Sequence, residues 1–386
     1  MSAVAGRLDI ARRLIGEPRT APPTPALLID LGRVRQNIAD MARRMTEMPA
    51  ALRPHAKIHK SPILAQLQLD AGAIGITTAN VWEASALIDA GLDDILVANQ
   101  VVGPIKAAEL ARIAGLGRVI VAVDDASNVD QIAAAARAAG SVVDLLVEVD
   151  VGFHRAGVRG IDDAVALAAH ADGQAGVRLV GVLGYEGHCM LEPDRAVRIS
   201  KTKAANAILI EAADRFAAAG HATEIVAGGG FGTWDITGAN PRITEIHAGS
   251  YIFTDAFHTA LMPGFAVALT VLTTVISRSG GTVVLDCGRK SIGFDRANPT
   301  VMGGHGAVRY EHGEYFIHEE HIVLDVPEDS PLAVGDTLEL SPGYAPTTVN
   351  HYDLYWVIED DRIADVWPIH ARYGSVTAGV GPPASF

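Results

Sequence analysis

The sequence predicts an α/β chain in which a (β/α)8 TIM barrel is followed by a mostly antiparallel β domain. Between residue 26 and about residue 250, nine short apolar runs alternate with amphipathic segments of helical length, and the eight that remain without the first favour a barrel. After about residue 262, apolar and polar residues alternate between Gly, Pro and Asp turns, as is typical of antiparallel strands. An open doubly wound sheet is the alternative for the first region. It would carry a glycine-rich dinucleotide loop after its first strand, and the sequence has none there.

The elements can be justified in order from these patterns. The eight barrel strands are expected at 51–55, 74–78, 95–98, 119–123, 142–149, 179–184, 224–227 and 243–246, and an earlier run at 26–30 is left out of the barrel. Helices are expected at 31–45, 81–90, 105–114, 126–139 and 195–219. Strands of the β domain are expected at 267–277, 281–285, 314–326, 337–340 and 352–360. With the boundary at Pro263-Gly264, we expect a barrel domain at 25–262 and a β domain at 263–386 that residues 1–24 join.

Composition excludes several classes of function. The chain has 386 residues and a formal net charge of -14, which argues against nucleic-acid binding because that usually needs a basic face. The longest apolar run, 265–276, is shorter than the roughly 20 residues that span a bilayer, so we expect no membrane partner. Cys189 and Cys287 are the only cysteines. We therefore expect no disulfide framework, no signal peptide and a cytoplasmic location.

The stretch 53–61, Arg-Pro-His-Ala-Lys-Ile-His-Lys-Ser, carries the strongest chemical signal. A lysine at the end of a buried strand loses solvation, so its amine is easier to deprotonate and can form a Schiff base with an aldehyde. The alternative is a basic strand edge at the surface. Other polar residues also follow predicted strands, at the barrel end where chemistry is found: Asn99-Gln100, Asp150, His154, Arg155, Tyr185, Glu186, His188 and His247.

Two glycine-containing loops follow the last two predicted strands. Gly228-Gly229-Gly230-Phe231-Gly232-Thr233 and Gly249-Ser250-Tyr251 stand where barrel enzymes commonly hold phosphate. Glycine lets backbone N–H groups approach an anion, and the hydroxyls of Thr233, Ser250 and Tyr251 would add donors. Tight turns that need a positive φ are the alternative reason for the glycines.

Together these features resemble the alanine racemase-like (fold-type III) class of pyridoxal 5'-phosphate enzymes, and within it the D-threonine aldolase / D-serine dehydratase family. The resemblance covers nearly the whole chain. The segments that carry it are 24–30, 53–60, 99–102, 148–152, 155–158, 228–230, 248–251 and 286–288.

The resemblance implies a role for each matching residue. Lys57, and not Lys60, would be the Schiff-base lysine, with His55 and His59 around it and Arg155 near the phenolic oxygen of the cofactor. His247 replaces a usual glutamine beside the ring nitrogen, where it would donate a hydrogen bond or simply pack. The remaining cofactor-binding residues would be Tyr185, Gly229, Gly230, Thr233, Gly249, Ser250 and Tyr251.

The chain departs from the family at its metal site. Tyr344 and Pro346 stand where the family has its histidine and its carboxylate or thiolate, so we expect no divalent metal. His351 and Asp353 have suitable side chains seven residues later and are the alternative site. Leu191 likewise stands where aldolases have a histidine near the metal.

Without a metal, three side chains are expected to transfer the protons of the reaction. Glu186 and His188 form a candidate acid/base pair, unless His188 only hydrogen-bonds to backbone. Tyr344 would donate or accept a proton from the β domain.

The resulting hypothesis is a pyridoxal phosphate-dependent lyase acting on a D-3-hydroxy amino acid. It would give either glycine and an aldehyde, or a 2-oxo acid and ammonia. A racemase or epimerase with one base on each face is the alternative, and a non-enzymatic carrier of the cofactor is the third hypothesis. The resemblance also implies a homodimer.

Overall fold

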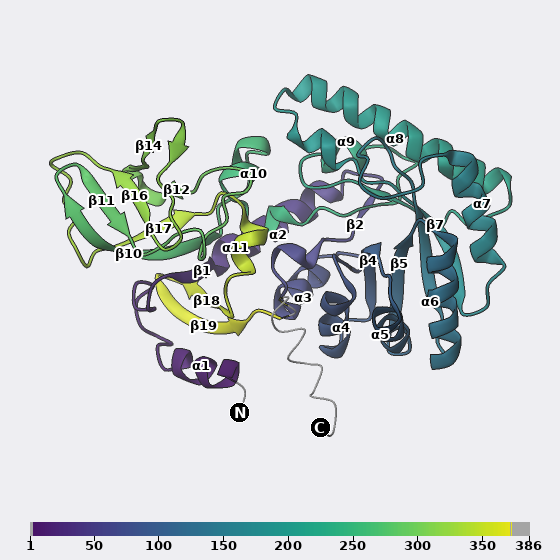
Figure 1. Cartoon of the computed structure of the whole chain (residues 1–386), viewed down its shortest axis with the longest axis horizontal. Coiled ribbons are helices and arrows are strands. Elements are labelled where there is room, and N and C mark those ends of the chain that lie inside the picture. The colour runs from purple at the N-terminus through teal and green to yellow at the C-terminus, as the bar shows by residue number, and fades with distance from the viewer. Residues whose placement is uncertain (1–2, 371, 373–386) are drawn as a thin grey trace. The chain divides into compact units, whose positions relative to one another are not determined.

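The computed structural model describes residues 3–370 and residue 372, and it separates into two compact units (Figure 1). One unit is Ala39–Gly249. The other combines the chain up to Ile38 with the segment that begins at Ser250.

The first unit contains an eight-stranded, all-parallel sheet in the order β2-β9-β8-β7-β6-β5-β4-β3. A single bridge from His55 to Thr77, in which Thr77 N–H donates to the Pro54 carbonyl at 2.8 Å, joins the first and last strands of that order. The sheet therefore closes on itself, and the predicted barrel is confirmed. Its strands are β2 (Ala51–Leu52), β3 (Ile76–Thr78), β4 (Asp94–Gln100), β5 (Arg118–Val123), β6 (Val143–Glu148), β7 (Val177–Leu183), β8 (Ile225–Gly228) and β9 (Glu245–Ile246).

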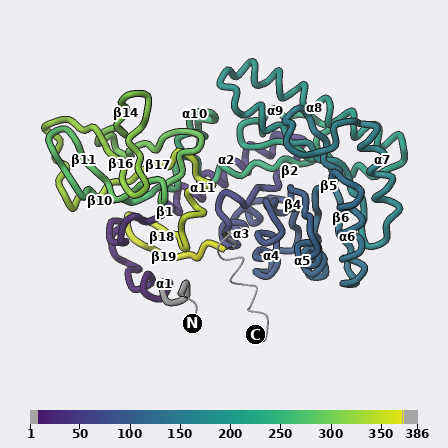
Figure 2. The backbone as a smooth tube through the Cα atoms, viewed as in Figure 1, coloured from purple at the N-terminus to yellow at the C-terminus, as the bar shows by residue number. Residues whose placement is uncertain are grey.

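Helices cover the outside of these strands (Figure 2). Several begin at a side chain that accepts backbone N–H groups, such as Asn80, Asp125 and Asp194, which is the usual reason for a helix to start there. The helices of this unit are α3 (Pro62–Asp70), α4 (Val81–Asp89), α5 (Pro104–Ala114), α6 (Ala126–Ala139), α7 (Ile161–Asp172), α8 (Arg195–Ala218) and α9 (Trp234–Thr237), and α2 (Leu31–Met45) is divided between the two units at 38/39.

The barrel core is a buried apolar cluster contributed by alternate residues of successive strands. Leu96, Ile120, Leu146 and Val180 belong to it. Because side chains two apart on a strand share a face, the charged residues that precede them by two lie on the same inner face, at the N-terminal ends of the strands.

The second unit is built on a nine-stranded sheet with the main order β13-β16-β11-β10-β1-β18-β19, and β17 pairs with β10 and β12. All pairs are antiparallel except β1 with β18. Its strands are β1 (Ala26–Asp30), β10 (Leu269–Ser279), β11 (Thr282–Leu285), β12 (Thr300–Val301), β13 (Ala307–Val308), β16 (Ile322–Asp325), β17 (Thr337–Ser341), β18 (Leu354–Glu359) and β19 (Arg362–Pro368).

The expected single strand at 314–326 is wrong. Its first part pairs as β15 (Glu314–Tyr315) with β14 (Tyr310–Glu311) in a separate hairpin, and only its second part joins the large sheet as β16. Shorter helices complete this unit: α1 (Ala3–Arg12), α10 (Ala256–Leu261) and α11 (Ala345–Val349).

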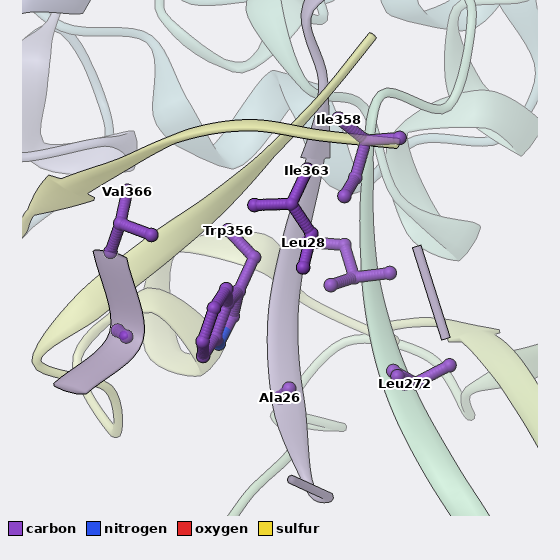
Figure 3. Packing of buried hydrophobic residues seen from close by; sticks show 8 residues of the cluster. Ala26, Leu28, Leu272, Trp356, Ile358, Ile363 and Val366 are labelled. Carbon is purple, nitrogen blue, oxygen red and sulfur yellow. The ribbon is translucent and has the colours of Figure 1, made fainter. Parts of the chain in front are cut away.

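The N-terminal segment packs into this second unit. Ala11 lies in one apolar cluster with Ala26, Leu28, Leu272, Trp356, Ile358, Ile363 and Val366, which Figure 3 shows around β1. The run at 26–30 therefore belongs to the mixed sheet, in agreement with its exclusion from the barrel. The domain limits 25–262 and 263–386 stay a prediction, and the compact units change at 38/39 and 249/250.

In the described part of the chain, no helix is both long and apolar enough to cross a bilayer.

Candidate active site

Lys57 and Lys60 lie three residues apart and have very different surroundings. Lys57 is in the 3-10 turn Ala56–Ile58 that follows β2. Within the described residues its amine has no hydrogen bond or ion pair, and burial together with the charges of Arg155 and Lys60 lowers its pKa to about 8. Lys60 is buried in an ion pair with Glu83, whose other oxygen accepts the Ala79 N–H at 2.8 Å. An amine in such a pair is not available as a nucleophile, whereas Lys57 is.

Two histidines flank Lys57 in sequence and are kept neutral. Burial first, and then the charges of Lys57 and His247, lower the pKa of His55 well below its usual range. Burial lowers the pKa of His59 to about 4. His59 Nδ1 accepts the Ser61 N–H at 3.1 Å, and its Nε2 lies 3.2 Å from Gln68 Oε1. His59 therefore supports the turn, while His55 lies between Lys57 and His247.

His247 contacts a buried carboxylate. Its Nε2 is 3.1 Å from Glu245 Oε1, and Arg53 makes a two-pronged contact with the same carboxylate at 3.1 and 3.3 Å. Burial raises the pKa of Glu245, but the His247 hydrogen bond and the Arg53 charge lower it more, to about 2. The Nε2 edge of the His247 ring is thus held by the protein. Whether its other side serves a cofactor stays a prediction.

Arg155 follows β6 and lies over two aromatic rings. Its guanidinium carbon is 5.1 Å from the Phe153 ring centre and 5.4 Å from that of Tyr185. Its ion pair with Glu148 is long, at 3.8 Å, and Gln100 donates to the same carboxylate at 2.6 Å. The cation therefore stays exposed at the barrel end, close enough to Lys57 to lower the pKa of that amine.

The glycine loop after β8 is held by hydrogen bonds to protein side chains. Gly229 N–H donates to Glu186 Oε2 at 3.0 Å and Gly230 N–H donates to Thr233 Oγ1 at 3.1 Å. These two N–H groups and the Thr233 hydroxyl brace the loop, and the phosphate-binding role expected of the loop stays a prediction. Gly230 still needs to be glycine, because a Cβ there would lie 3.1 Å from both Met190 Sδ and the Tyr185 ring. The following helix, α9, has only four residues.

The second glycine loop also depends on close packing. A Cβ on Gly249 would lie 2.5 Å from the His55 carbonyl, so only glycine fits against the turn that carries Lys57. Ser250 and Tyr251 start a 3-10 turn that belongs to the other compact unit. There Tyr251 is buried, and its ring centre is 6.2 Å from that of Phe265.

Glu186 and His188, the predicted acid/base pair, have different surroundings, and their pairing stays a prediction. Glu186 is 1% exposed, and both of its carboxylate oxygens accept hydrogen bonds, from Gly229 and from Thr237. His188 stacks on Phe153 at 5.9 Å, and its Nε2 is 3.4 Å from Cys189 Sγ. Its Nδ1 is buried and has no partner in the described structure. A buried ring nitrogen without a partner costs free energy, which marks His188 as a group that a ligand could satisfy.

Tyr344 lies in the β unit and caps α11. Its ring stacks on His258 at 5.7 Å, and His258 Nδ1 lies 2.8 Å from the buried Asp255 carboxylate. Burial raises the pKa of the Tyr344 hydroxyl. Pro346 is in the first turn of α11, where proline is common.

The residues do not fit the metal that the family pattern implies. Neither Tyr344 nor Pro346 offers a usual ligand, and the described residues contain no cluster of three His, Cys, Asp or Glu side chains suited to a metal. Of the alternative pair, Asp353 is in an ion pair with Arg372 and His351 is exposed, and a metal site formed by the two stays a prediction. Metal-independent action nevertheless stays a prediction.

Sequence reasoning missed the partners that distinguish these groups. Glu83 is 23 positions from Lys60 and Thr237 is 51 positions from Glu186, and no local pattern signals either contact. Phe153, next to Arg155 in the same strand-end segment, could have been found from its position alone.

The site fits pyridoxal phosphate by its own chemistry. It has an unpaired amine with a pKa of about 8, a cation beside it, and glycine loops that a Cβ would fill. A family model described as "Alanine racemase, N-terminal domain" matches residues 29–255, and one described as "Putative serine dehydratase domain" matches residues 268–358.

Known relatives match over most of their length. D-threonine aldolase from Arthrobacter sp is 36% identical, over 92% of this chain and 94% of the relative. D-threo-3-hydroxyaspartate dehydratase from Delftia sp. (strain HT23) is 31% identical, over 89% and 96%. The crystal structure of D-threonine aldolase from Filomicrobium marinum superposes with a TM-score of 0.88 at 32% identity, over 94% of this chain and 99% of that one. The chain therefore belongs to the pyridoxal phosphate-dependent lyases that join an alanine racemase N-terminal domain to a serine dehydratase domain.

Proposed function

We propose that this protein cleaves a D-3-hydroxy amino acid to glycine and an aldehyde, using pyridoxal phosphate bound to Lys57. The observation that carries the proposal is the contrast between two neighbouring lysines: Lys57 has a lowered pKa and an amine without a partner in the described residues, and Lys60 is paired with Glu83. Similarity to D-threonine aldolases supports the choice of aldol cleavage.

The residues proposed to hold the cofactor follow strands of the barrel. Lys57 would bind its aldehyde carbon, Arg155 would face its phenolic oxygen, and the loop at 228–233 with Gly249 would enclose its phosphate. The phosphate-binding roles of Ser250 and Tyr251 stay predictions. When bound, the cofactor supplies an electron sink at the substrate α-carbon.

His188 is the proposed base for the substrate 3-hydroxyl. Aldol cleavage requires a group that accepts this proton as the Cα–Cβ bond breaks, and the buried, unpartnered Nδ1 of His188 supports that role. Glu186 is the weaker candidate, because both of its oxygens are already occupied.

The acid/base role of Tyr344 stays a prediction, and only the surroundings of Tyr344 within its own unit bear on it. Its raised pKa keeps the hydroxyl protonated at neutral pH, so it would donate a proton rather than accept one. The homodimer and the cytoplasmic location that the resemblance implies also stay predictions.

Product analysis tests the proposal. The purified protein is incubated with D- and L-threonine, D-3-hydroxyaspartate and D-alanine, once with chelator and once with added Mn²⁺. We expect glycine and acetaldehyde from D-threonine, and turnover that survives the chelator. Formation of a 2-oxo acid and ammonia would make the protein a dehydratase, and inversion without cleavage would make it a racemase. Turnover only with Mn²⁺ would contradict metal-independent action.

A further inference from the structure

We propose that Glu186 is a positioning residue that braces the glycine loop for the phosphate of the cofactor, and that it does not itself transfer protons. The inference rests on the proposed function for the position of the phosphate. In this role Glu186 increases the affinity for pyridoxal phosphate relative to pyridoxal, which has no phosphate.

Glu186 connects segments that are distant in sequence. It follows β7, and its Oε2 accepts the Gly229 N–H of the loop after β8 at 3.0 Å. Its Oε1 accepts the Thr237 hydroxyl of α9 at 2.5 Å. Thr237 Oγ1 in turn accepts from Asn206 Nδ2 of α8 at 3.3 Å. All three side chains are buried.

The loop needs such a brace because its backbone is unusual. Gly229 has a φ of 77°, and a Cβ at this position would lie 3.1 Å from Ile246. A glycine with this freedom samples many conformations unless another group fixes it. The carboxylate fixes its N–H, and Thr233 fixes that of Gly230, so the loop is set in one conformation.

The charge of Glu186 argues for a geometric role. A carboxylate beneath an anion site repels the anion, so Glu186 contributes nothing favourable to phosphate binding through its charge. What it offers is two acceptor oxygens at fixed positions. A glutamine can serve the same contacts, because its amide oxygen accepts from Gly229 while its NH₂ donates to Thr237, whose proton then turns toward Asn206 Oδ1, 3.4 Å away.

The test compares the dissociation constants of pyridoxal phosphate and pyridoxal for the full chain after removal of cofactor, followed by absorbance. Pyridoxal has the same aldehyde and ring but no phosphate. We expect Glu186→Ala to weaken pyridoxal phosphate binding about tenfold, the ratio that corresponds to ordering about one loop residue on binding, and to change pyridoxal binding less than about threefold. Glu186→Gln should keep the affinity for pyridoxal within about threefold and bind pyridoxal phosphate at least as tightly as the wild type, because the amide keeps both contacts and removes the repelling charge.

A second pair of variants covers the case in which Glu186→Ala does not fold. Thr237→Val removes one brace and should reduce the preference for the phosphorylated form, and Thr237→Ser should restore it. Thr273→Val is the matched control, since Thr273 is a buried threonine that donates to Asp286 at 2.7 Å in the other unit. It should leave the preference unchanged.

Three outcomes would overturn the inference. An unchanged preference in both Glu186→Ala and Thr237→Val would remove the bracing role alone. A Glu186→Gln variant that binds cofactor normally but turns over at least about a hundredfold more slowly would make Glu186 a proton-transfer group. A wild-type chain that binds both forms equally would overturn the phosphate position, and with it this part of the proposed function.

Discussion

The two ends of the barrel use similar charged side chains in opposite ways. At the N-terminal ends of the strands, Asp94, Arg118, Asp144 and Arg178 form a chain of ion pairs, with contacts of 2.6–3.4 Å between successive members. Arg53 extends the chain from Asp94 to Glu245. At the C-terminal ends, the amine of Lys57 and the Nδ1 of His188 have no partner within the described residues.

This difference indicates which side chains can react with a ligand. A buried charge with matched partners is held in one protonation state, and removal of either partner is destabilising because it leaves the other charge buried alone. A buried titratable group without partners has a shifted pKa or an unsatisfied atom, and it can act on a ligand. Removing a group without partners should reduce activity, whereas breaking a matched ion pair should reduce stability.

The largest effect is expected from the two lysines. Lys57→Ala should abolish the visible absorbance of bound cofactor and reduce turnover to background, because no nearby free amine replaces it. Lys60→Met should keep the absorbance band but lower the free energy of unfolding by about 3 kcal/mol, since it leaves Glu83 buried without its cation. The contrast is lost if Lys60→Met removes the band and Lys57→Ala keeps it.

Replacing His188 should have the next largest effect. We expect His188→Asn to lower kcat about 10²–10⁴-fold, the range for loss of a general base, with cofactor absorbance retained. His170→Asn, at an exposed ion pair on α7, is the control and should leave kcat unchanged. Steady-state kinetics with D-threonine measures both, and equal rates for the two variants would exclude His188 as the base.

Removing a charge at the N-terminal ends of the strands, where the charges are paired, should change the stability of the protein rather than its activity. The pKa of Glu245 is about 2 in the fold, against an ordinary value of 4.5. The ionised carboxylate therefore stabilises the fold above about pH 4.5, and this contribution is lost as the pH falls toward 2. At about 1.4 kcal/mol per pKa unit the contribution is about 3 kcal/mol.

Urea unfolding at several pH values tests this. Wild type should exceed Glu245→Gln in stability at pH 6, and the two should converge near pH 2 to 3. The exposed Glu47→Gln serves as the control and should follow the wild type throughout. A difference that does not depend on pH would show that the Glu245 charge is not the cause.

The smallest effect concerns the pH dependence of cofactor capture. Only the neutral amine attacks an aldehyde, so the rate at which the cofactor-free protein captures pyridoxal phosphate should rise between pH 6 and 9 with a midpoint of about 8. Stopped-flow absorbance measures this rate. A midpoint near 10.5, the ordinary value for lysine, would show that the Lys57 surroundings do not lower its pKa.

The barrel was predictable from local patterns, whereas the partners at the site were not. The periodicity of β4, β5 and β6 marks buried strands, and the expected helix at 31–45 matches α2. The run at 314–326 was misread because alternation alone does not show that its two halves pair with different strands. The contacts of Glu186 with Gly229 and Thr237 are not predictable from sequence, because these residues are 43 and 51 positions away and meet Glu186 only in the folded barrel.

We propose that Lys57 reacts with the cofactor because its amine has no partner within the described residues. Lys60 does not react because its amine is paired with Glu83. The most direct test is to incubate the full-length protein with pyridoxal phosphate, reduce it with borohydride, digest it and locate the modified lysine by mass spectrometry. We predict a stable adduct on Lys57 and none on Lys60. An adduct on Lys60, or no adduct within residues 53–61, would contradict the claim.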